Sequence, residues 1–171
     1  MSEQHPQSDT RDEVLANIRK ARAELEASFA GLSEHQLTVP RTSGGWSIKD
    51  HLAHIAAWQR RCLAIIAGKH PADGFEIDHE TYDQLDDAHA INDVLYRRYR
   101  DRTLSEVIED FRGTHREVEM TVQAMSEQDL IQPLSGPVAN RFPRVVDLIN
   151  FNIARHDRVH IKDIRVLGER R

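Results

Sequence analysis

Apolar residues recur at intervals of three and four along most of this chain, a spacing that marks one face of an α-helix. The segments long enough to form stable helices span residues 11–29, 46–68, 103–125 and 144–168. No stretch shows the alternation of apolar and polar residues that predicts a half-buried β-strand. The pattern therefore predicts an all-α protein with four long amphipathic helices.

Capping signals support these helix boundaries. Ser47 precedes Asp50 by three residues, and Thr103 precedes Glu106 by the same interval. Both pairs match the capping box, which satisfies unpaired backbone N–H groups at a helix start. Gly68 then ends the second helix, because glycine readily adopts the conformation that closes a helix. Four such helices in a chain of 171 residues predict a four-helix bundle.

Shorter segments connect the long helices. We predict single helical turns at 32–37 and 126–130, loops at 38–45 and 69–75, an irregular link at 132–143, and a helical connector at 78–101 between the second and third long helices. Residues 1–9 are polar and predict a flexible tail, which leaves 10–171 as a single domain.

The composition is typical of a soluble globular protein, with 39% hydrophobic and 30% charged residues. The net charge is −5 and no basic stripe is present, so we expect no nucleic-acid partner. No apolar run of about 18 residues exists, so we expect neither a membrane span nor a membrane partner.

Cysteine usage and the N-terminal sequence favour a cytoplasmic protein. Cys62 is the only cysteine, so no internal disulfide can form, in agreement with a reducing compartment. The first residues, MSEQHPQSDTRDE, lack the apolar stretch of a signal peptide. Cys62 lies in an apolar helical pattern, where a small buried residue is expected and a catalytic thiol is the alternative.

The fourth predicted helix carries His156 and His160 in a segment that otherwise has the pattern of a core helix. At about 100° per residue, they fall about 20° and 60° from Val145, among the isoleucines, whereas Asp157 falls outside that sector. Two buried imidazoles need partners, because an unpaired buried polar group costs about 1–3 kcal/mol. Their i, i+4 spacing suits two ligands of one metal ion; hydrogen-bonded core histidines are the alternative.

The second helix offers a candidate third ligand. His51 and His54 lie beside its apolar face, near Trp58, and the helical wheel places His51 closer to the centre of that face. A third histidine from a facing helix would leave an open coordination position, as in catalytic metal sites. The remaining histidines lie in predicted loops or on polar faces, where we expect solvation: His5, His35, His70, His79, His89 and His115.

Two motifs carry a resemblance to a known family. The first, GGWSIKDHLAHIAAWQRR, contains the pattern W-S-x-x-x-x-L-x-H-I-x-x-W from Trp46 to Trp58. The second, NIARHDRVHIKDIR, contains N-x-x-x-H-x-x-x-H from Asn152 to His160. Together they resemble the DinB-like superfamily of four-helix bundles and, more narrowly, the ClbS/DfsB branch. The resemblance extends from residue 10 to residue 168.

The resemblance implies which residues bind a metal. In the superfamily, one histidine of the second helix and two of the fourth are the ligands, and these correspond here to His54, His156 and His160. The wheel favours His51 as the inward residue, whereas the resemblance favours His54. Histidine ligands suit zinc or nickel, with iron as an alternative. Four further residues are candidates for the surroundings of the metal or for a pocket beside it: His51, Trp58, Asn152 and Asp163.

Three functions are compatible with these residues. The resemblance implies a metal-dependent enzyme that activates water or a small thiol against an electrophilic small molecule, as a hydrolase or thiol-dependent transferase. The alternative is a metal-independent protein of the ClbS/DfsB type that binds or sequesters a small toxic molecule. ClbS-like members that protect against a cyclopropane-bearing genotoxin do not all retain the histidine triad. The third is a purely structural helical dimer, and the resemblance itself implies a homodimer.

Overall fold

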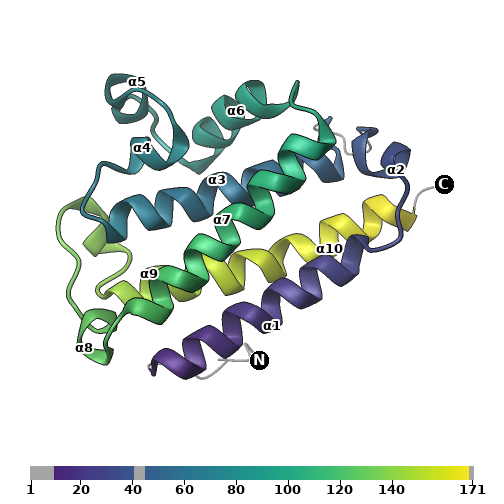
Figure 1. Cartoon of the computed structure of the whole chain (residues 1–171). Coiled ribbons are helices and arrows are strands. Elements are labelled where there is room, and N and C mark those ends of the chain that lie inside the picture. The colour runs from purple at the N-terminus through teal and green to yellow at the C-terminus, as the bar shows by residue number, and fades with distance from the viewer. Residues whose placement is uncertain (1–9, 41–44, 170–171) are drawn as a thin grey trace, which may run out of the picture.

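The computed structural model describes residues 10–40 and 45–169, and every regular element in these ranges is helical (Figure 1). The long helices are α1 (Arg11–Phe29), α3 (Ile48–Ile66), α7 (Leu104–Ala124) and a C-terminal run of α9 (Val145–Asn150), η2 (Phe151–Arg155) and α10 (His156–Glu169). The predicted all-α fold is confirmed. No helix in the described ranges is long and apolar enough to cross a membrane. The predicted tail at 1–9, with His5, lies outside the described residues.

Short elements join the long helices. They are α2 (Glu34–Thr38), α4 (Pro71–Phe75), α5 (His79–Asp83), α6 (Ala88–Tyr99), α8 (Glu127–Leu130) and the 3-10 turn η1 (Pro137–Asn140). The capping boxes predicted at Ser47 and Thr103 are both present, and each side chain accepts the backbone N–H three residues further on. These boxes begin α3 and α7, the two helices that cross in Figure 1.

Two connections differ from the sequence-based prediction. The segment 69–75, predicted as a loop, contains α4, because His70 Nδ1 accepts a backbone N–H at 3.2 Å. Pro71 occupies the first helical position, where its missing N–H has no helical partner to lose. The connector 78–101 is divided into α5 and α6, because Asp87 accepts a backbone N–H at 2.9 Å and begins a new helix.

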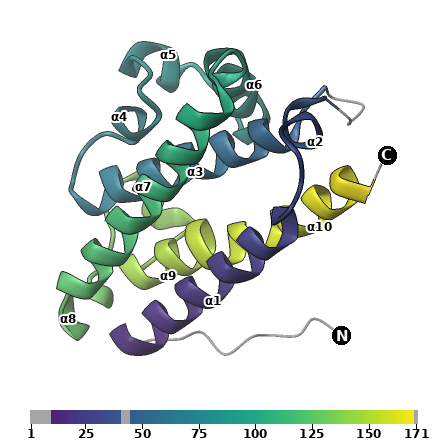
Figure 2. The same ribbon diagram turned by 45° about the vertical axis from the view of Figure 1, so that its right-hand side comes forward.

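Helix α3 lies at the centre of the arrangement. It packs against α7 and α10, while α4, α5 and α6 lie together on the side of α3 away from α1 (Figures 1 and 2). Helix α1 runs alongside α10. Buried apolar side chains form two clusters, one around Leu52 and Phe111 and the other around Ile18 and Leu148. Both clusters contain residues of α3, so its position depends on packing along its whole length.

Cys62 belongs to the second of these clusters and is 1% exposed. Burial raises the pKa of its thiol to about 12. A thiol that stays protonated at neutral pH is a poor nucleophile and a poor metal ligand. Cys62 is therefore a small buried core residue, as the apolar helical pattern indicates.

A π-helical turn, η2, lies directly before His156. Such a turn holds one residue more than an α-helical turn, so it rotates the following residues by about 100° relative to an uninterrupted helix. For this reason the wheel drawn from Val145 misplaces Asp157, although Ile164 and Leu167 are buried as it predicts. Asp157, predicted outside the buried face, is fully buried, whereas His156 and His160 are half-buried at its edge. The π turn thus directs both histidines toward α3.

Candidate metal centre

Four histidines from two helices meet where α3 packs against α10. His54 faces His156 and His51 faces His160. His51 and His54 are three residues apart on α3, and His156 and His160 are four residues apart on α10. The two histidines of each helix therefore lie on one face of that helix. The structure therefore brings together all three residues expected to bind a metal, with His51 beside them.

The ring nitrogens of His54, His156 and His160 converge. His156 Nε2 lies 3.1 Å from His54 Nε2 and 3.1 Å from His160 Nε2. One ligand atom from each ring lies within 4.8 Å of the others. Tetrahedral coordination with metal–nitrogen bonds of about 2.0–2.1 Å separates ligand nitrogens by about 3.4 Å. The two separations of 3.1 Å are close to this value, so the arrangement suits a single divalent ion.

Hydrogen bonds alone do not satisfy this cluster. A neutral imidazole nitrogen carries either one hydrogen or one lone pair in the ring plane. His156 Nε2 faces two other ring nitrogens, yet it can complete only one good hydrogen bond with them. A cation removes this conflict, because it binds all three lone pairs at once. The arrangement of nitrogens thus suits a metal better than paired neutral histidines.

Burial keeps these imidazoles neutral. It lowers the pKa of His54 and of His160, and the neighbouring histidines lower both further. Burial also lowers the pKa of His156 to about 4. Neutral imidazole is the form that binds a metal. At pH 7 the three side chains are therefore in the ligand form, and protons compete weakly for the site.

Aromatic side chains enclose the histidines of α3. The ring centroid of Trp46 lies 5.2 Å from that of His51 and 5.4 Å from that of His54, and Trp46 stacks on Tyr96 of α6. Trp58 lies 6.0 Å from the His54 ring, and its indole N–H donates to an asparagine of α6 at 3.0 Å. These contacts restrict rotation of both imidazoles. Trp58 therefore lies beside the cluster.

The other two residues expected near the metal take different positions. Asn152 is buried, and its side-chain amide donates to the Leu148 carbonyl of its own helix at 2.9 Å. Asp163 Oδ2 lies 3.8 Å from His160 Nδ1, and the Asp163 side chain is 55% exposed. Asn152 is thus engaged within the helix, whereas Asp163 lies at the outer edge of the cluster.

The helical wheel favours His51 as the inward residue, whereas the resemblance favours His54 as the third ligand. In the structure these two histidines lie next to different ring nitrogens of α10. His54 Nε2 joins the three-nitrogen cluster, whereas His51 Nδ1 lies 3.1 Å from Nδ1 of His160, on the other side of that ring. His51, His160 and Asp163 form a second set of groups whose possible ligand atoms lie within 4.8 Å of one another. His160 is common to both sets.

Sequence reasoning missed a buried polar network next to His156. Asp157 accepts hydrogen bonds from Arg22 at 3.1 Å and from Gln59 at 3.0 Å. Burial raises the pKa of Asp157 to about 6, although Arg22 opposes the shift. One signal was available in the sequence. Arg22 follows Ile18 by four residues on the apolar stripe of α1, a position that requires a buried partner for a charge.

His115 was expected to be solvated, and this prediction is wrong. The residue is 7% exposed, and its Nε2 lies 3.1 Å from Glu119 Oε1. Burial, and then the positive charge of Arg22, lower the pKa of His115 to about 4. Its position four residues after the buried Phe111 is the signal that could have placed it on the inner face of α7.

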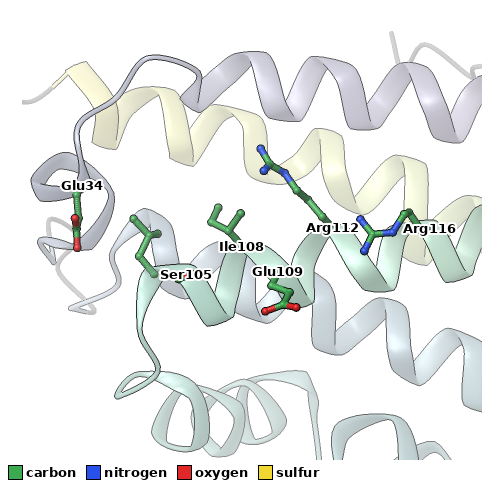
Figure 3. Close-up of a pocket in the computed structure, with 7 residues that line it drawn as sticks. Glu34, Ser105, Ile108, Glu109, Arg112 and Arg116 are labelled. Atoms are coloured by element: carbon green, nitrogen blue, oxygen red, sulfur yellow. The ribbon is translucent and has the colours of Figure 1, made fainter.

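A groove of about 590 Å³ lies along α7 beside α2 (Figure 3). Its lining includes the exposed residues Glu34, Ser105, Glu109, Arg112 and Arg116, and no histidine. The charged side chains are of both signs, so the groove has no single electrostatic preference. It is distinct from the four-histidine cluster on α3 and α10.

Several solved structures share this fold. The structure of Sibling Lethal Factor Precursor, DfsB, is 21% identical with a TM-score of 0.71, covering 92% of this chain and 94% of that one. The colibactin self-resistance protein ClbS, in complex with double-stranded DNA, is 14% identical with a TM-score of 0.75, covering 96% and 98%. An uncharacterised protein from Escherichia coli UTI89 is 15% identical with a TM-score of 0.74, covering 98% and 96%. At these identities the likeness shows the fold alone.

The family is shown by the sequence itself. A comparison with curated proteins found no match. A sequence model of the DinB superfamily, however, matches residues 17–164. This span is most of the chain and includes all four clustered histidines. The chain therefore belongs to the DinB superfamily.

Proposed function

We propose that this protein is a metal-dependent enzyme that binds one divalent transition-metal ion through His54, His156 and His160. The observation that carries the proposal is the convergence of three Nε2 atoms, with His156 Nε2 3.1 Å from each of the other two. Three protein ligands leave one coordination position for water or substrate, which is typical of catalytic sites.

The chemistry proposed is nucleophilic attack on an electrophilic small molecule. A divalent ion at this position supplies the Lewis acidity that activates water or a small thiol, so the enzyme is a hydrolase or a thiol-dependent transferase. The chain's own residues hold and orient the site. Trp46 and Trp58 form apolar walls beside His54.

The metal proposed is zinc or nickel, with iron as the alternative. Three neutral imidazoles form a borderline donor set that these ions share, so availability in the cell contributes to the choice. We place the enzyme in the cytoplasm, in agreement with its one buried cysteine, and we propose that it acts as a homodimer.

Metal content tests this proposal directly. Elemental mass spectrometry of the purified, tag-free full chain is expected to find close to one transition-metal ion per chain. His156→Ala should lose the ion, because two imidazoles remain where three are needed. His89→Ala is the matched control, since His89 is exposed on α6, and it should keep the ion. Absence of metal from the wild type, even after reconstitution with zinc and nickel, would contradict the proposal.

The structural likeness to ClbS favours a second candidate, a metal-independent protein that binds a small toxic molecule. In that case the histidines are hydrogen-bonded residues of a binding pocket. Because the ClbS structure contains double-stranded DNA, our expectation of no nucleic-acid partner needs a test of its own. Fluorescence anisotropy with a labelled duplex at low salt serves that purpose, and we expect no binding from a chain of net charge −5.

A further inference from the structure

His160 has a close neighbour at each of its two ring nitrogens. Nε2 lies 3.1 Å from His156 Nε2, inside the three-nitrogen cluster. Nδ1 lies 3.1 Å from His51 Nδ1, outside that cluster. A ring that binds a metal through one nitrogen carries its hydrogen on the other. With a metal at Nε2, the hydrogen of His160 is therefore at Nδ1 and needs an acceptor.

We infer that His51 is a positioning residue for the metal centre, and that its Nδ1 accepts the Nδ1–H hydrogen bond of His160. This inference rests on the proposed metal site. Asp163 is the other candidate acceptor, but its Oδ2 lies 3.8 Å from His160 Nδ1 and its side chain is 55% exposed. That distance is beyond a hydrogen bond, whereas 3.1 Å is within range.

The surroundings hold His51 in this role. It is 7% exposed, so the ring cannot turn freely into solvent, and Trp46 lies edge-on to it with centroids 5.2 Å apart. Its other nitrogen, Nε2, is buried and has no hydrogen-bond partner among residues 10–40 and 45–169. No hydrogen bond within those ranges therefore prevents His51 from carrying its hydrogen on Nε2. In that tautomer the lone pair of Nδ1 is free to accept a hydrogen bond from His160.

His160 differs in this respect from the other two ligands. The outer nitrogens of His54 and His156, Nδ1 in each case, are buried without a hydrogen-bond partner in the part of the chain that the structure describes. Among the three ligands, only His160 has a described side chain within hydrogen-bond distance of its outer nitrogen. Partners of this kind orient a ligand and raise its basicity, and their removal typically weakens metal affinity about 10–100-fold.

Two variants separate the hydrogen bond from packing. His51→Leu removes the acceptor and keeps an apolar side chain of similar size, so zinc affinity, measured by competition with a chromophoric chelator, should fall about 10–100-fold. His51→Asn places an amide oxygen close to the former Nδ1 position and should retain most of the affinity. His89→Leu is the matched control, because His89 is exposed on α6 and lies outside both sets of clustered groups, and it should bind zinc as the wild type does.

A spectroscopic measurement on the zinc-loaded wild type tests the bond without any variant. In ¹⁵N-histidine-labelled protein, a scalar coupling between His160 Nδ1 and His51 Nδ1 is expected, because couplings of this type pass only through an N–H···N hydrogen bond. A merely structural His51 would not produce it. Absence of this coupling in protein that has bound zinc would overturn the inference.

The outcomes distinguish this inference from the metal proposal. Wild-type protein that takes up no zinc overturns both. Wild-type protein that binds one zinc, together with a His51→Leu variant that binds equally well, overturns only the role of His51. Two ions per chain would also overturn it, because a second ion held by His51, His160 and Asp163 would occupy the nitrogen that must carry the hydrogen.

Discussion

Arg22, Gln59 and Asp157 form a hydrogen-bonded network that is buried although all three side chains are polar. The Arg22 guanidinium also lies 3.8 Å above the ring of Phe111. A buried ion pair adds little net stability compared with apolar residues, but it allows few alternative arrangements once its partners are matched. The network joins α10 to α1 and α3 by hydrogen bonds at Asp157, the residue next to His156.

His115 makes stability depend on pH. Burial lowers its folded-state pKa to about 4, whereas the unfolded residue titrates near about 6.5. Between these values the unfolded chain binds a proton that the folded chain does not, so the free energy of unfolding falls as the pH decreases from about 6.5 toward about 4. His115→Gln should reduce this loss, as measured by urea unfolding at pH 7 and at pH 5.

The control for this prediction is His89→Gln, because His89 is exposed and its substitution should leave the pH dependence unchanged. Both variants must be measured without metal, because metal binding by neutral imidazoles is itself pH-dependent and would add to the effect. The prediction would be contradicted if the wild type and His115→Gln lost the same unfolding free energy between pH 7 and pH 5.

At the scale of elements, α4 lies so close to α3 that only glycine fits at position 74. A Cβ added to Gly74 would lie 2.5 Å from the Arg60 carbonyl oxygen and even closer to the Arg61 backbone. This contact holds Phe75 against Trp58, with ring centroids 5.1 Å apart. Trp58 in turn borders His54. The approach of the two backbones is therefore part of what shapes the candidate metal centre.

Gly74→Ala should destabilise the protein by about 1–3 kcal/mol, because the added methyl group forces α4 away from α3. Gly113→Ala is the matched control. Gly113 lies within α7, and an added Cβ there has its nearest neighbour at 3.7 Å, so the change should stabilise the helix by about 0.5–1 kcal/mol. Urea unfolding measures both effects, and a Gly74→Ala variant as stable as the wild type would show that α4 is not held closely.

At the scale of the whole molecule, the candidate metal centre joins distant parts of the chain. His54 and His156 are 102 residues apart in sequence, and they come from the central helix α3 and from α10. An ion bound by both helices connects them in the folded state, and the unfolded chain cannot offer the same geometry. Metal binding should therefore stabilise the entire fold.

Thermal unfolding tests this linkage. With free zinc at about 100 times the dissociation constant, binding adds about 2.7 kcal/mol to the free energy of unfolding, so the melting temperature of the wild type should rise. His156→Ala should show no such rise at the same zinc concentration. A similar rise in the variant would mean that zinc binds elsewhere on the protein.

Much of the fold could be predicted from the sequence, because helix formation depends on local features. The apolar periodicity predicted the four long helices, and the capping boxes at Ser47 and Thr103 predicted where two of them begin. Local signals also explain the errors. The cap at Asp87 that divides the connector is a single side chain within a helical pattern, and periodicity does not reveal it.

The sequence by itself determined the all-α class, the family, and which histidines share a helix face, since each of these depends on residues close together along the chain. Only the tertiary structure decided the burial of Asp157, the direction of His156 and His160, and the contact of His51 with the outer nitrogen of His160. The physical reason is that a π turn rotates all later residues about the helix axis. In addition, the packing of α3 against α10 determines which histidine ring nitrogens of the two helices contact each other. Neither effect is encoded in residue spacing along a single helix.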